Sequence, residues 1–266
     1  MYDSFNRKIN YLRISVTDRC NLRCKYCMPE EGIELLHHKD ILSFDEISEI
    51  VKQSVKLGID KIRITGGEPL VRKGIVDLVH MIAQIPGILD FGMTTNGTLL
   101  EYFAEDIKKA GLHRINISLD TVNPEKFHEI TRKGNLEDVF RGIETAKKAG
   151  LTPIKINCVI KESKTEQDAL EVAEFCKAND LKIRYIKQME LAKGTFSIVD
   201  GGTGGNCSIC NRLRLSANGI FYPCLFSNIG YNVRELGIKE AIEKAVSNKP
   251  KSGSCSNVNH FYNIGG

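Results

Sequence analysis

The chain has 266 residues, a length that suits one large α/β core with at most a small additional domain. Its 37 Lys and Arg residues barely outnumber its 33 Asp and Glu residues, and no basic block stands out, so we expect no nucleic-acid partner. No stretch approaches the roughly 18 apolar residues of a membrane span, and residues 1–5 lack a signal-peptide core, which predicts a cytoplasmic protein with no membrane partner.

Short runs rich in β-branched residues alternate with segments of helical periodicity along residues 11–187. The predicted strands are Leu12–Val16, Lys61–Ile64, Phe91–Thr94, Arg114–Ser118, Ile154–Ile160 and Lys182–Ile186. The predicted helices are Ser43–Leu57, Ile75–Gln84, Leu99–Ala110, Leu136–Ala149 and Thr165–Ala178. Ser43 followed by Glu46 predicts a capping box at the start of the first helix.

Alternation of this kind predicts a parallel sheet, and right-handed crossovers curl such a sheet toward a barrel. Six strand–helix units are fewer than the eight of a complete TIM barrel. We therefore predict an α/β fold in which residues 1–190 form an incomplete (β/α)6 TIM-type barrel, with a doubly wound open sheet as the alternative. Residues 191–266 are predicted to form a small C-terminal extension.

Nine cysteines in a cytoplasmic chain indicate metal ligands before disulfides. Cys20, Cys24 and Cys27 lie in one short run, Cys-Asn-Leu-Arg-Cys-Lys-Tyr-Cys, directly after the first predicted strand. A structural zinc site needs four protein ligands, whereas a cubane iron–sulfur cluster held by only three thiolates keeps one iron open for another ligand. A zinc site with a distant fourth ligand and oxidised cysteine pairs are the alternatives.

Polar segments also follow the later strands. Gly66-Gly67-Glu68-Pro69 follows the second strand, Thr94-Thr95-Asn96-Gly97 follows the third, Ser118-Leu119-Asp120 ends the fourth, and Met189 lies just past the sixth. Because sites in barrels and in open α/β sheets form at the carboxyl ends of the strands, we expect these segments to surround one site.

Cationic residues alternate with apolar residues along five of the six strands, although buried parallel strands normally read as continuous apolar runs. With a period of two, the polar set shares one face and should line the barrel interior, where unpaired cations are costly and indicate an anionic ligand such as phosphate. Arg114 and Lys182, at strand starts, are expected to face water instead. The cations predicted to bind the ligand are Arg13, Arg63, Lys155 and Arg184.

A second group of three cysteines, Cys207, Cys210 and Cys224, follows the barrel segment. Asn218-Gly219 predicts a hairpin turn that would return Cys224 toward the first two, so a second cluster with an open iron is expected in the C-terminal extension. A zinc ribbon that uses His260 as its fourth ligand is the alternative. Of the other cysteines, Cys158 and Cys176 are expected to be buried packing thiols, and Cys255 has no readable role.

The run from Cys20 to Cys27, with Tyr26 before its last cysteine, resembles the signature of the radical S-adenosylmethionine superfamily. In that superfamily the open iron binds S-adenosylmethionine, and an electron from the cluster cleaves it to a 5′-deoxyadenosyl radical. The longer segments Arg7–Cys20 and Cys210–Leu215, together with the terminal Gly265-Gly266, resemble the GTP 3′,8-cyclase family of molybdenum cofactor biosynthesis.

This resemblance implies a lyase that converts GTP to (8S)-3′,8-cyclo-7,8-dihydroguanosine 5′-triphosphate, with two [4Fe-4S] clusters and S-adenosylmethionine as cofactors. The two triads would hold the clusters, and the second cluster would bind the guanine edge. The residues implied for S-adenosylmethionine are Tyr26, Gly67, Ser118 and Met189. Those implied for GTP are Arg13, Arg63, Thr94, Lys155, Arg212, Leu213 and Arg214, with Lys61 and Arg184 lining the same cavity, and those implied for catalysis are Arg13, Gly265 and Gly266.

Implied partners are a low-potential electron donor of the flavodoxin or ferredoxin type and a downstream cyclic pyranopterin monophosphate synthase, with a homodimer possible. The chain departs from the family pattern between residues 190 and 206, where family members carry several tens of residues and this chain ends in the glycine tract 201–205. We expect that tract to be a flexible linker and the barrel to be more open there. A radical enzyme acting on a peptide or another nucleotide, and a non-catalytic electron-transfer protein, are the competing hypotheses.

Overall fold

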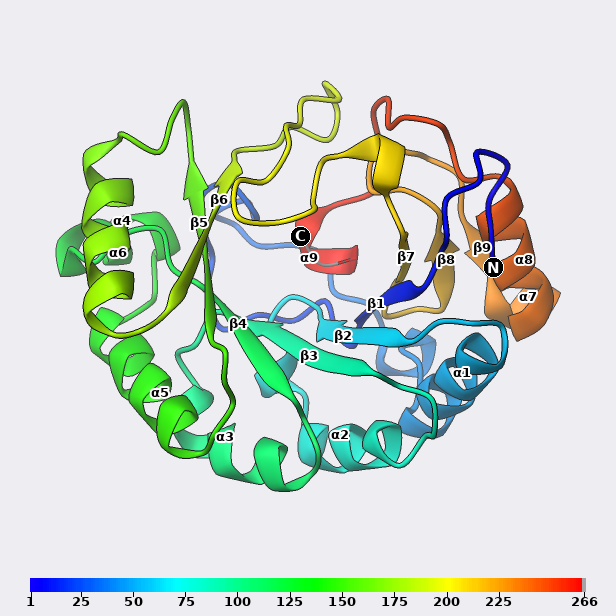
Figure 1. The fold of residues 1–266 in the computed structure, drawn as a ribbon, viewed down its shortest axis with the longest axis horizontal. Helices are drawn as coiled ribbons and strands as arrows, with labels where there is room; N and C mark the ends of the chain where they lie inside the picture. The colour runs from blue at the N-terminus through cyan, green and yellow to red at the C-terminus, as the bar shows by residue number, and fades with distance from the viewer. Residues whose placement is uncertain (265–266) are drawn as a thin grey trace.

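A computed structural model describes residues 1–264, so Gly265 and Gly266 lie outside the described part of the chain. Six parallel strands curl into an open ring with helices on its outer side (Figure 1). The strands are β1 (Tyr11–Ser15), β2 (Lys61–Thr65), β3 (Asp90–Thr95), β4 (Arg114–Ser118), β5 (Lys155–Ile160) and β6 (Lys182–Lys187). The helices between them are α1 (Phe44–Lys56), α2 (Ile75–Ala83), α3 (Leu100–Lys109), α4 (Pro124–Thr131), α5 (Leu136–Lys148) and α6 (Gln167–Ala178).

The predicted partial barrel is confirmed, with strand and helix ends displaced by one or two residues. The capping box is also present: Ser43 Oγ accepts from the backbone N–H of Glu46 at 3.1 Å, and Glu46 Oε2 accepts from that of Ser43 at 2.7 Å. Helix α4 was not predicted, although Asn123 caps it and Pro124 occupies its first turn, two signals that mark a helix start.

The two faces of the strands have different chemistry. Leu12 and Ile14 of β1 are fully buried under the helices, in register with Ile62 and Ile64 of β2. The residues between them point into the ring, which places Arg13 beside Arg63 in the same row. The period-two argument therefore predicts the polar lumen correctly.

The C-terminal segment continues the same sheet. Strand β7 (Arg212–Leu215) pairs in parallel with β1 and puts Arg214 beside Arg13, then turns at Asn218-Gly219 into the antiparallel β8 (Ile220–Tyr222). This confirms the predicted hairpin, and Gly219 has the positive φ of 86° that such a turn requires. The short β9 (Tyr231–Asn232) ends the sheet, whose order is β6-β5-β4-β3-β2-β1-β7-β8-β9.

Helices α7 (Val233–Leu236) and α8 (Ile238–Ser247) follow β9 on the outer side, and the last helix, α9 (Phe261–Ile264), lies within the ring of strands (Figure 1). Ile264 is fully buried there in a small apolar cluster with Leu191, Tyr222, Leu225 and Phe226. The chain thus returns into the lumen before its last two residues. None of the helices described here has the length and apolar character needed to cross a membrane.

Candidate active site

The first cysteine loop follows β1 and rests on the Gly66-Gly67-Glu68 turn at the end of β2. The backbone N–H of Gly67 donates to the carbonyl of Thr17 at 2.8 Å, and that of Glu68 donates to the carbonyl of Arg19 at 2.8 Å. A Cβ atom at Gly67 would lie 2.4 Å from the Arg19 oxygen. Glycine is therefore needed at this position for the chain just before Cys20 to pack against β2.

Glu68 ties the same turn to the end of β3. Its fully buried carboxylate accepts hydrogen bonds from the N–H of Leu70 (3.0 Å), the hydroxyl of Thr95 (2.7 Å) and the N–H of Asn96 (2.7 Å). Burial outweighs these three donors and raises the pKa of Glu68 to about 7. Asn96 in turn donates to the side-chain oxygen of Asn21 at 2.9 Å, inside the cysteine loop.

Tyr26 is fixed by an acid at the end of β4. Its hydroxyl donates to Asp120 Oδ2 at 2.7 Å, and the backbone N–H of Val159 donates to Asp120 Oδ1 at 2.8 Å. Burial raises the pKa of Asp120 to about 6. Ser118, two residues earlier, is partly exposed at the same strand end.

The three thiols of the first loop are partly buried and close enough to influence each other. Burial and the repulsion from the other two thiolates raise the pKa of Cys24. Burial and, to a smaller extent, the charge of the Cys20 thiolate raise the pKa of Cys27 to about 12. Three thiolates in such surroundings need a positive core, which an iron–sulfur cluster supplies. Within residues 1–264 no three metal-ligating side chains are arranged around a single ion. A cubane does not need that arrangement, because each thiolate binds a different iron.

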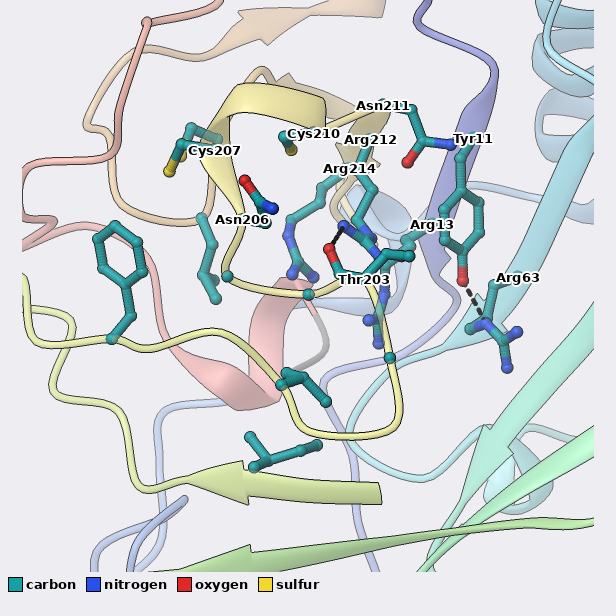
Figure 2. A pocket seen from close by; sticks show the side chains of 18 of the residues that line it. Tyr11, Arg13, Arg63, Thr203, Asn206, Cys207, Cys210, Asn211, Arg212 and Arg214 are labelled. Carbon is teal, nitrogen blue, oxygen red and sulfur yellow. Dashed lines mark hydrogen bonds between the residues drawn. The ribbon is translucent and has the colours of Figure 1, made fainter. Parts of the chain in front are cut away.

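A cavity of about 290 Å³ lies in the lumen between β1, β2, β7 and residues 196–206 (Figure 2). Thr94 and Met189 line it, as predicted for members of one site. Its basic lining residues are Arg13, Lys61, Arg63, Arg114, Arg184, Arg212, Arg214 and Lys249. Among the described lining residues, Asp90 is the only acid, and Arg114 binds it at 2.6 and 2.8 Å.

The clustering of cations depresses their pKa values. Burial and then Arg214 lower the pKa of Arg13 well below its usual value, and burial and then Arg212 lower that of Arg214 to about 10. Because each shift reflects like charges held together away from water, a polyanion bound in this cavity would relieve the repulsion.

Two of the predicted cations and one apolar residue lie differently from expectation. Arg114 was expected to face water, which is wrong: it lines the cavity and pairs with Asp90, whereas Lys182 is exposed as expected. Lys155 is outside the set of lining residues, although burial, Arg184 and Arg114 lower its pKa to about 8. Leu213 lies in the hydrophobic core, with 1% of its surface exposed.

Tyr11 was missed by the sequence analysis and lies beside Arg63 and Arg212 (Figure 2). Its hydroxyl accepts a hydrogen bond from Arg63 Nε, and the guanidinium carbons of Arg63 and Arg212 lie 5.9 and 5.5 Å from its ring centroid. Burial would raise the pKa of Tyr11, but Arg63 and Arg13 lower it overall. The signal was available, since Tyr11 precedes Arg13 by two residues and so shares its face. Asn116 and Asn157, which belong to the polar alternation of β4 and β5, also line the cavity.

All three cysteines of the second triad line this cavity, whereas Cys20, Cys24 and Cys27 are not among the described residues that line it. The short helix η3 (Cys207–Ile209) carries the first, and Cys224 follows β8. His260 does not complete a zinc site here: it is exposed, lies outside the cavity lining and stacks on Tyr262 at 5.0 Å. Cys158 and Cys176 are buried, as expected.

Helix α9 connects the two triads. Tyr262 lies near enough to Cys27 for the thiolate charge to contribute, after burial, to raising the pKa of the tyrosine. Ile264, two residues later, packs with Leu225 and Phe226, which line the cavity beside Cys224. Gly265 and Gly266, expected to be catalytic, follow directly and lie outside the described residues.

The glycine tract 201–205 is more than a spacer. The carbonyl of Gly201 accepts from Arg184 Nε at 3.2 Å, and Thr203 accepts from Arg212 through its carbonyl (3.1 Å) and its hydroxyl (2.7 Å; Figure 2). Residues 202–205 line the cavity. The expectation of a mere linker at this point is therefore wrong: the tract forms one wall of the site and occupies two of its arginines.

The fold and the first triad together define a class of enzyme. The Radical SAM superfamily model matches residues 14–176, and the chain belongs to that superfamily. Among solved structures, native anSMEcpe with bound AdoMet matches with a TM-score of 0.64 at 15% identity, covering 91% of this chain and 81% of that one. SuiB of Streptococcus suis matches with a TM-score of 0.54 at 19% identity, covering 69% and 41%. At such identities these structures support the fold alone.

Curated relatives give the family within this class. The GTP 3′,8-cyclase of Thermodesulfovibrio yellowstonii is 42% identical over 96% of each chain, and that of Petrotoga mobilis is 38% identical over 95% of this chain and 94% of its own. That of Peptoclostridium acidaminophilum is 38% identical over 100% and 98%. The chain belongs to the GTP 3′,8-cyclase family. It is thus a radical S-adenosylmethionine lyase whose cofactors are iron–sulfur clusters and S-adenosylmethionine.

Proposed function

We propose that this protein converts GTP to (8S)-3′,8-cyclo-7,8-dihydroguanosine 5′-triphosphate, the radical step that begins molybdenum cofactor biosynthesis. The observation that carries the proposal is the cavity in which eight basic residues and one paired acid share the lining with three cysteines. A nucleoside triphosphate matches both parts, since its phosphates need cations and its base offers nitrogen and oxygen ligands to an open iron.

The first triad and its supports suit the S-adenosylmethionine site. Cys20, Cys24 and Cys27 would hold the first cluster, which together with S-adenosylmethionine supplies a 5′-deoxyadenosyl radical when both are bound. Gly67 presents bare backbone beside the cysteine loop, and Tyr26 is held against Asp120. With Ser118 and Met189 at neighbouring strand ends, these residues would bind and orient the cofactor.

The row of cations would hold the triphosphate. Arg13, Arg63 and Arg214 lie side by side in register, and Lys61 and Arg212 flank Tyr11 in the next row. Each close cation–phosphate pair is worth about 4 kcal/mol at an intermediate dielectric before desolvation is subtracted, and arginine adds bidentate geometry. Thr94 and Arg184 also line the cavity. Lys155 lies outside the lining, and its positive charge would attract the phosphates without direct contact.

The second triad would orient the other end of the substrate. Cys207, Cys210 and Cys224 would hold a cluster whose open iron binds the guanine edge, and Leu213 would act through the core that fixes β7. We also propose that Gly265 and Gly266, which lie outside the described residues, take part in catalysis together with Arg13. The proposal also includes a division of the chain into residues 1–190 and 191–266, and a cytoplasmic location. The partners that we propose are an electron donor of the flavodoxin or ferredoxin type, a downstream cyclic pyranopterin monophosphate synthase, and a second copy of the chain in a homodimer.

The test is anaerobic turnover by reconstituted protein given GTP, S-adenosylmethionine and a reductant. We expect 5′-deoxyadenosine and the cyclic nucleotide to form together and to stop together when GTP is omitted or replaced by ATP. Formation of 5′-deoxyadenosine that does not depend on GTP, with no cyclic product, would contradict the proposal. In that case calorimetry with peptides and other nucleotides would identify the substrate class, although the arginine row favours a polyanion.

A further inference from the structure

Lys249 is a buried amine that none of the roles above uses. It lies two residues beyond the end of α8, only 3% of its surface is exposed, and it lines the cavity. Burial of a lysine is costly unless its charge is compensated. Among the described residues that line the cavity, the only acid is Asp90, which already pairs with Arg114. Its charge therefore calls for a different partner.

The ammonium of Lys249 joins the start of β7 to the segment just after β8. It donates to the carbonyl of Arg212 at 2.7 Å and also to the carbonyl of Pro223. Arg212 lies two residues after Cys210, and Pro223 directly precedes Cys224. One side chain thus fixes the separation of two of the three thiols.

The segment from Lys249 to Gly253 approaches all three sulfurs of the second triad. The ammonium of Lys249 faces the thiol of Cys210. The hydroxyl of Ser252 donates to Cys207 Sγ at 3.8 Å, and a Cβ at Gly253 would lie 3.3 Å from Cys224 Sγ. Lys249, Ser252 and Gly253 therefore form one wall of the triad.

Arg7 holds this wall in place from the other end of the chain. Its guanidinium donates to the carbonyls of Pro250 (2.7 Å), Lys251 (3.1 Å) and Cys207 (2.7 Å). Asp3 forms an ion pair with Arg7 at 2.6 Å, so the charge of the Arg7 guanidinium is itself compensated. The position of Lys249 beside the thiols is consequently built into the fold.

We propose that Lys249 is a positioning residue of the second triad: it fixes the spacing of Cys210 and Cys224 and places its ammonium beside the cluster that they hold. This rests on the proposed assignment of the second triad to an iron–sulfur cluster. A positive charge beside a cluster stabilises the more negative, reduced state of that cluster, so it makes reduction easier. Removal of the charge should make the cluster harder to reduce.

The experiment uses the full chain with Cys20, Cys24 and Cys27 all changed to alanine, so that any iron belongs to the second triad. In this background we compare Lys249→Met, Lys249→Gln and Lys249→Arg with Lys251→Met, which removes an exposed lysine of the same segment. The readouts are iron and acid-labile sulfide per chain, and the midpoint potential from an EPR-monitored redox titration.

We expect Lys249→Arg and Lys251→Met to retain the iron and the potential of the background protein. Lys249→Met should lose most of the iron, and Lys249→Gln, which keeps a donor without the charge, should retain iron but show about a tenfold lower reduced-to-oxidised ratio at a fixed potential. If Lys249→Met does not fold, Lys249→Gln decides the effect of the charge.

Unchanged iron and potential in Lys249→Gln and Lys249→Met would overturn the role of Lys249 while leaving the second cluster in place. Loss of the cluster in Lys249→Arg would overturn the argument from charge. A background protein that binds no iron would instead show that the triad holds no cluster, and would overturn the assignment on which the inference depends. The two failures are therefore distinguishable.

Discussion

The first cysteine triad lies beside two buried acids, whereas the second lies against buried cations. After burial, Glu68 contributes to the raised pKa of Cys20, and burial and the other two thiolates, followed by Asp120, raise that of Cys24. The charge of Lys249 lowers the pKa of Cys210 overall, and it partly offsets the burial that raises the pKa of Cys224. Two loops with the same number of thiols thus differ in the charged groups that face them, which are carboxyl groups at the first loop and the ammonium of Lys249 at the second. Surroundings that oppose added negative charge suit a strongly reducing centre, and cationic surroundings suit one that holds an anionic substrate.

The largest effect that separates the triads should come from removing one thiol of each. Cys24→Ala should lower the formation of 5′-deoxyadenosine by about a thousandfold or more, because the first cluster initiates the radical chemistry. Cys210→Ala should still cleave S-adenosylmethionine but form no cyclic nucleotide. Both products are measured by chromatography after anaerobic turnover.

The matched control is Cys255→Ala, since that thiol is exposed and belongs to neither triad. It should behave as the unaltered protein does. A Cys210→Ala variant with full cyclic product would show that the second triad is dispensable, and the comparison between two centres would then fail.

A smaller effect concerns the acid that supports the first loop. The pKa of Glu68 is about 7 in the folded chain against an ordinary 4.5, so the folded state keeps a proton that the unfolded state releases between these values. The stability that this proton provides is complete below about pH 4.5 and is lost as the pH rises through 7, by about 3 kcal/mol in total. Urea unfolding at about pH 5 and about pH 8 measures the loss.

Glu68→Gln cannot titrate and should lose this part of the pH dependence while remaining folded. Asp45→Asn, in the exposed first turn of α1, is a control that should retain it. If Glu68→Gln shows the same fall in stability as the unaltered chain, the carboxylate is ionised throughout, and its three hydrogen-bond donors outweigh burial.

The sequence was sufficient for those features that follow from local pattern. The alternation of Arg13 and Arg63 with buried isoleucines gave the polar lumen, and Asn218-Gly219 gave the hairpin that extends the sheet. It was not sufficient for contacts between distant segments. Nothing in the run around Lys249 indicates that its ammonium meets the carbonyls of Arg212 and Pro223, because that meeting depends on how α8 packs outside β8.

Arg114 shows the same limit on a smaller scale. A cation at a strand start usually reaches water, but the register of β3 with β4 sets Gly92 opposite Arg114 and brings Asp90 within reach. The glycine tract 201–205 was expected to be a linker because composition alone cannot show that Thr203 finds Arg212. In each case the partner lies on another element, and only the tertiary structure supplies it.

The smallest expected effect tests whether the cationic half of the comparison is a preorganised binding surface. Tyr11→Phe removes the hydroxyl that accepts from Arg63 Nε but leaves the ring beneath Arg63 and Arg212. One such hydrogen bond is worth about 0.5–1.5 kcal/mol, so the KM for GTP should rise about two- to tenfold with little change in kcat. Tyr102→Phe, on an exposed tyrosine of α3, should change neither constant. An equal fall in kcat instead would mean that Tyr11 acts only once the substrate has begun to react. The cations would then be arranged around the transition state rather than around GTP itself.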